Sequence, residues 1–86
     1  MLLTFEEFKQ AKETVNRILK DTNVEDVDDE LENIAKQIDE EKRREFLNHL
    51  NGLFLDILLN RLDELGESAR DKSMAARRKI TELINR

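Results

Sequence analysis

The 86-residue chain contains no proline, cysteine, tyrosine or tryptophan, and it has only two glycines. Proline and glycine form sharp turns and aromatic residues favour strands, so their scarcity removes much of what a sheet and its hairpins need. Charged residues make up 41% of the chain and hydrophobic residues 38%, which is typical of helical globular or coiled-coil proteins. We therefore predict an all-α fold, as a single helical domain over residues 1–86.

The absence of cysteine excludes disulfides, thiolate catalysis and cysteine-ligated metal sites, and it fits a reducing compartment. The first residues do not resemble an export signal, because Glu6, Glu7 and Lys9 interrupt any apolar region there. The longest uncharged run, 46–55, has ten residues, far fewer than the ~20 apolar residues that span a bilayer. We expect a cytoplasmic protein with no membrane partner.

Charge is distributed unevenly along the chain. Residues 1–41 carry thirteen acids and five bases, a net charge of −8, whereas residues 42–86 carry seven acids and ten bases, a net charge of +3. The two halves could pair within one bundle, pair between protomers, or present separate charged surfaces to partners. The negative total of −5 argues against a general nucleic-acid binder, which needs a dominant basic face.

The first half of the chain predicts two amphipathic helices. Thr4 and Glu7 have the spacing of a capping box, and apolar residues then recur at helical spacing, which predicts a helix over 5–20. Thr22 and Glu25 repeat the capping pattern before a second helix over 24–37. Asp39 is a candidate cap for a third helix, although a helix that continues through 39–45 is the alternative.

The third helix, at about 40–65, is the most apolar and is predicted to be the centre of a bundle of three to four helices. At 100° per residue its apolar side chains cover roughly 240° of the helix circumference. A chain of this length leaves part of such an arc uncovered, so we expect a homodimer or a larger oligomer. The residues predicted to form the core or the oligomer interface are Phe46, Leu50, Leu53, Phe54, Ile57 and Leu58.

Gly66 is suited to a helix C-terminus, and a last helix is predicted from about Ser68. This helix has one apolar face and many basic residues on its other faces. A regulator that binds nucleic acid through these basic residues is one of the alternative functions. The basic residues are Arg70, Lys72, Arg77, Arg78, Lys79 and Arg86.

The second predicted helix carries a dense acidic face. Such a face could imitate nucleic-acid phosphates and bind a partner with a basic surface, or it could simply solvate the helix and favour its N-terminus. The residues predicted to bind a partner are Glu25, Asp26, Asp28, Asp29 and Glu32.

His49 is the only histidine, and one histidine with Asp56 nearby supplies too few ligands for a metal site. Arg44 and His49 form an Arg-x4-His spacing that is similar to the catalytic motif of the HEPN ribonucleases. That resemblance implies an all-helical RNA-cleaving enzyme in which the pair lies near a dimer interface. The residue after Arg44 is Glu45, whereas the family usually has Asn, Asp or His there.

No residue pattern calls for a cofactor or predicts a metal site. The leading hypothesis is therefore a small non-enzymatic interaction protein, such as an adaptor, an inhibitor or an antitoxin-like bundle, that docks on a protein partner. The HEPN-like ribonuclease and the nucleic-acid regulator are the alternatives.

Overall fold

The computed structural model describes residues 2–86, and these residues form helices without any strand. The elements are α1 (Phe5–Asp21), the short 3₁₀-helix η1 (Val24–Asp26), α2 (Val27–Gln37), α3 (Glu40–Asn60) and α4 (Leu62–Ile84). The predicted all-α class is confirmed. The described part of the chain has four α-helices, the larger of the two numbers predicted from the sequence. Among the described residues, no helix is both long enough and apolar enough to cross a membrane.

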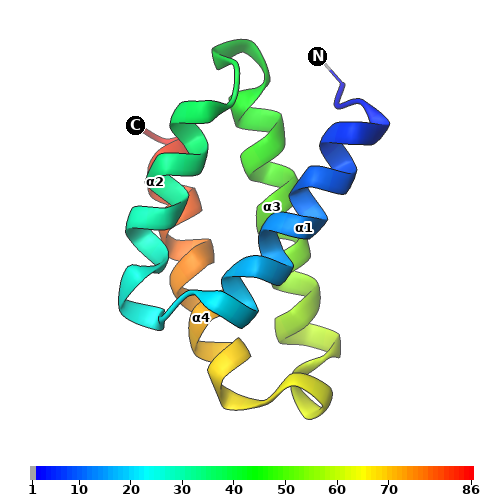
Figure 1. The fold of residues 1–86 in the computed structure, drawn as a ribbon, viewed down its shortest axis with the longest axis vertical. Helices are drawn as coiled ribbons and strands as arrows, with labels where there is room; N and C mark the ends of the chain where they lie inside the picture. Colours follow the sequence, from blue (N-terminus) through cyan, green and yellow to red (C-terminus); the bar gives the residue numbers. More distant parts are fainter. Residues whose placement is uncertain (1) are drawn as a thin grey trace.

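The helices are arranged in two layers (Figure 1). Helices α1 and α2 form one layer, and α3 and α4 form the other as an antiparallel pair. Successive helices run in alternating directions, so α1 lies beside α3 with the same direction and α2 lies beside α4 with the same direction. The contact between α3 and α4 is the most extensive in the bundle.

The start of α1 follows the predicted capping box. Thr4 Oγ1 accepts from the Glu7 amide at 3.2 Å, and Glu7 Oε1 accepts from the Thr4 amide at 2.7 Å. The capping box predicted at Thr22 and Glu25 is wrong, because Thr22 is the extended residue that ends α1. The second helix instead begins with η1, whose N-cap residue Asn23 makes no side-chain capping bond.

The chain breaks between α2 and α3 at Ile38 and Asp39, which settles the alternative of a continuous helix. Asp39 occupies the predicted N-cap position, but its side chain makes no capping hydrogen bond. The polar residues 40–45 form the first turns of α3. Arg43 donates from Nε to the carbonyl of Ala35 at 2.6 Å and from Nη2 to that of Ile38 at 3.0 Å, so it satisfies carbonyls at the end of α2.

The third helix ends earlier than predicted. It stops at Asn60, where Arg61 has φ −130° and ψ 10°, rather than at Leu65. The chain then makes a short helical turn and bends at Gly66, whose φ of 87° is the only positive φ in the described residues. Periodicity could not reveal this early end because the apolar spacing continues through Leu62 and Leu65.

The core lies between the two layers, and α3 contributes its largest side chains. Phe46, Leu50, Phe54 and Ile57 are buried, whereas Leu53 and Leu58 are partly exposed. Helix α1 contributes Ala11, Val15 and Ile18, and α2 contributes Val27, Leu31, Ile34 and Ala35.

Helix α4 faces the core with small side chains, which explains its close approach to α3. Ala69, Ser73 and Ala76 are buried on this face, with Ile80 as the one large residue. Small residues on one helix allow the large side chains of its neighbour to fill the space between them. Ser73 is completely buried, and its hydroxyl has no hydrogen-bond partner among the described residues.

Candidate functional site

The predicted acidic face divides into two parts in the structure. Glu25 and Asp26 in η1 and Asp28 and Asp29 in the first turn of α2 are exposed, and they form no ion pair within residues 2–86. Their negative charge favours the N-terminus of α2, where unpaired amides carry partial positive charge. Glu32, the fifth predicted residue, faces α4 and has a different role.

Glu32 connects α2 to the last turns of α4. Its carboxylate accepts from Arg86 at 2.6 and 3.2 Å and contacts Lys79 Nζ at 3.1 Å. Hydrogen bonds from Arg86 and Lys79 lower the pKa of Glu32 from 4.5 to about 2. Glu82 also pairs with both cations, at 2.8 Å from Lys79 and 2.6 Å from Arg86. Glu32 is therefore paired within the chain, unlike the four exposed acids before it.

The acidic first half and basic second half of the chain meet within the bundle. Lys42 pairs with Glu7 at 2.9 Å. The hydrogen bond from the Thr4 amide, and then this contact with Lys42, lower the pKa of Glu7. Lys72 donates to the Leu19 carbonyl at 2.9 Å, near the end of α1. Pairing inside one bundle is thus the observed outcome for Glu7 and Glu32, whereas the exposed acids of η1 and α2 stay unpaired.

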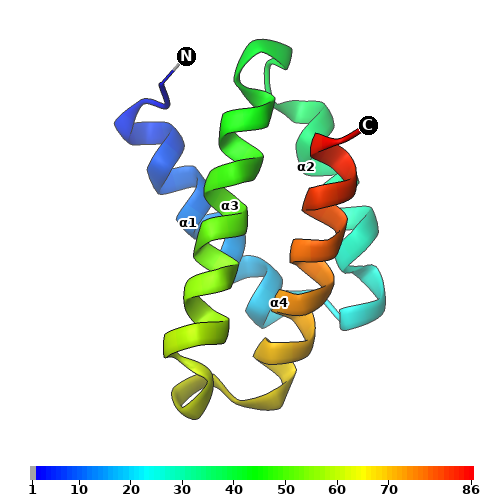
Figure 2. The same ribbon diagram turned by 180° about the vertical axis from the view of Figure 1, so that it is seen from behind.

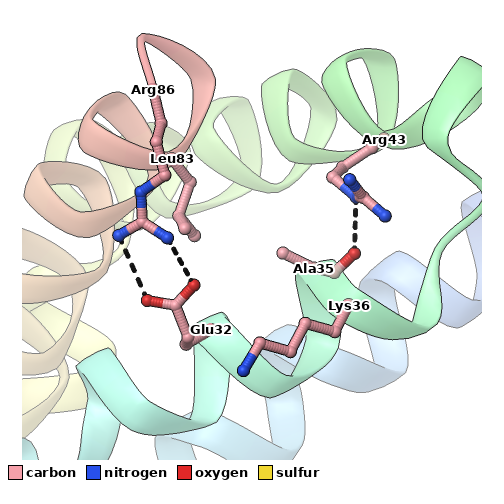
Figure 3. Close-up of a pocket in the computed structure, with 6 residues that line it drawn as sticks. All are labelled: Glu32, Ala35, Lys36, Arg43, Leu83 and Arg86. Atoms are coloured by element: carbon pink, nitrogen blue, oxygen red, sulfur yellow. Dashed lines mark hydrogen bonds and ion pairs between the residues drawn. The ribbon is translucent and has the colours of Figure 1, made fainter.

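A groove of about 320 Å³ lies at the end of the bundle, between α2, the start of α3 and the end of α4 (Figure 3). Arg86 and Arg43 reach α2 from opposite sides of this groove, and Leu83 lies between them. Arg86 is held by Glu32, and Arg43 is held by backbone carbonyls. These contacts hold α2 in place, so the polar groups at both sides of the groove have structural roles.

The structure does not bring Arg44 and His49 together. They are five residues apart on α3, so a regular helix places them roughly 140° apart around its axis. His49 faces α1, where its ring meets that of Phe8 edge-to-face at 4.8 Å between centroids. Arg44 is exposed on a different side of α3 and makes no hydrogen bond within the described residues.

The side of α3 and α4 that faces away from α1 and α2 is not covered by another helix (Figure 2). Asn51 Oδ1 accepts from Arg77 Nε at 2.9 Å and sets the register of the two helices. Because the helices are antiparallel, Leu55, one turn after Asn51, lies level with Met74, one turn before Arg77. The next turn brings Leu59 level with Arg70.

We call this surface the outer face, and its apolar part is exposed. Leu59 is 70% exposed and Met74 is 54% exposed, and Leu55 and Leu58 beside them are partly exposed. The sequence indicated this exposure, since Leu55, Leu58 and Leu59 belong to the wide apolar arc of α3 but are not buried in the core. The outer face consists of Glu41, Arg44, Asn48, Asn51, Leu55, Leu58 and Leu59 of α3 and Glu67, Arg70, Asp71, Met74, Arg77 and Arg78 of α4.

Three arginines of the outer face are without an acidic partner. Arg44 and Arg78 are exposed and Arg77 binds the neutral amide of Asn51, and none of them forms an ion pair within residues 2–86. Arg70 differs, because it lies 3.7 Å from Glu67 and 3.4 Å from Asp71. The same side of the two helices also carries the exposed acids Glu41, Glu67 and Asp71, so the outer face combines exposed apolar side chains with charges of both signs.

Within residues 2–86, no three or more His, Cys, Asp or Glu side chains lie close enough together to hold a metal ion. Comparisons with models of protein families, with curated proteins and with solved structures find no match to this chain.

Proposed function

We propose that this protein is a small non-enzymatic interaction module that docks on a protein partner through its outer face. The observation that carries the proposal is the exposure of Leu59 and Met74 beside Leu55 on a side that no other helix covers. Burial of apolar surface contributes roughly 25 cal/mol per Å², which makes such a surface favourable to cover. Apolar side chains accompanied by arginine are also characteristic of protein interfaces.

The geometry favours docking over the ribonuclease alternative. A ribonuclease of the HEPN kind would need Arg44 and His49 to act on one phosphate group. In this chain the two side chains lie on different sides of α3, and the ring of His49 packs against Phe8. Docking through the outer face uses side chains that already lie beside one another.

Site-specific photocrosslinking in the native host tests the proposal. A photoreactive phenylalanine analogue at Leu59 places the probe on the outer face, and the same analogue at Lys12, an exposed position on α1, is the matched control. We expect the probe at Leu59 to give a discrete protein adduct and the probe at Lys12 to give none. The adduct should disappear when Met74→Glu is introduced into the same chain, because a carboxylate would then enter the apolar interface.

Two results would contradict the proposal. An adduct between the probe at Leu59 and RNA would show that the partner of the outer face is a nucleic acid and not a protein. Equal protein adducts from Leu59 and Lys12 would show that the outer face has no special role. Circular dichroism of each substituted protein establishes that the helical fold is retained before adducts are compared.

A further inference from the structure

We draw no further inference here: the strongest candidate, the exposed apolar patch around Leu59 and Met74 on the outer face of α3 and α4, is flanked by charges of both signs, and nothing in the structure shows what covers it.

Discussion

Glu32 on α2 and Arg86 near the end of α4 form a two-point ion pair, with Nη1 to Oε2 at 2.6 Å and Nη2 to Oε1 at 3.2 Å. The two residues are 54 positions apart, and each comes from a different half of the charge distribution. Lys79 contacts the same carboxylate from one side. The pair therefore joins the two layers of the bundle. The sequence shows that the two residues have opposite charges, but not that they meet.

The pH dependence of stability should report this contact. The pKa of Glu32 is about 2 in the folded chain against an ordinary 4.5, so its stabilising effect is complete above pH 4.5 and is lost as the pH falls towards 2. Glu32→Gln should be less stable than the parent above pH 4.5, and this difference should vanish near pH 2. Thermal melts over that range measure it. Asp28→Asn, at an acid without an ion pair in the described residues, is the matched control.

The two glycines should respond to alanine with opposite signs. Gly52→Ala should stabilise the fold by about 0.5–1 kcal/mol, since alanine is the better helix former and has open space around it. Gly66→Ala should destabilise it by about 1–3 kcal/mol, because φ is 87° and ψ is −176° at this bend. Urea unfolding gives both values. Equal effects at the two positions would mean that the bend at Gly66 is absent in solution.

The buried hydroxyl of Ser73 should be dispensable. It has no hydrogen-bond partner among the described residues, so Ser73→Ala removes the cost of burying it and should stabilise the protein by about 1 kcal/mol. Thr14 is the control, since its hydroxyl donates to the Gln10 carbonyl at 2.8 Å and Thr14→Val should not stabilise. A loss of stability in Ser73→Ala would indicate that the hydroxyl has a partner in solution.

Two leucines of α3 should differ sharply in their effect on stability. Leu50→Ala should cost about 2–5 kcal/mol because Leu50 is completely buried. Leu59→Ala should change stability by less than about 0.5 kcal/mol because Leu59 is 70% exposed. Guanidinium unfolding compares them. A large cost at Leu59 would mean that it is covered in solution, which is the result expected if the predicted homodimer forms through the outer face.

His49 distinguishes docking from catalysis. His49→Ala removes an edge-to-face contact with Phe8 and should leave partner binding unchanged in a binding assay. Charge reversal of Asp28 and Asp29 should also leave it unchanged, because these residues lie on α2, away from the outer face. RNA cleavage by the parent chain that both Arg44→Ala and His49→Ala abolish, with their folds intact, would instead support the HEPN-like ribonuclease.

Local signals in the sequence were sufficient where only neighbouring residues matter. The capping box of Thr4 and Glu7 and the bend at Gly66 were both visible, because each depends on a few adjacent residues. The same kind of pattern was wrong at Thr22, where the chain leaves α1 in an extended conformation. It also missed the break at Arg61, because apolar spacing continues across it.

By itself, the sequence determined that this protein is helical and that α3 has more apolar surface than one helix neighbour can cover. Periodicity and composition act within a few turns, so they contain this information directly. Only the tertiary structure decided that Glu32 is an internal contact, that Arg43 binds the end of α2, and which leucines of α3 remain exposed. Those outcomes depend on which helices lie side by side, and packing between residues distant in the chain decides that.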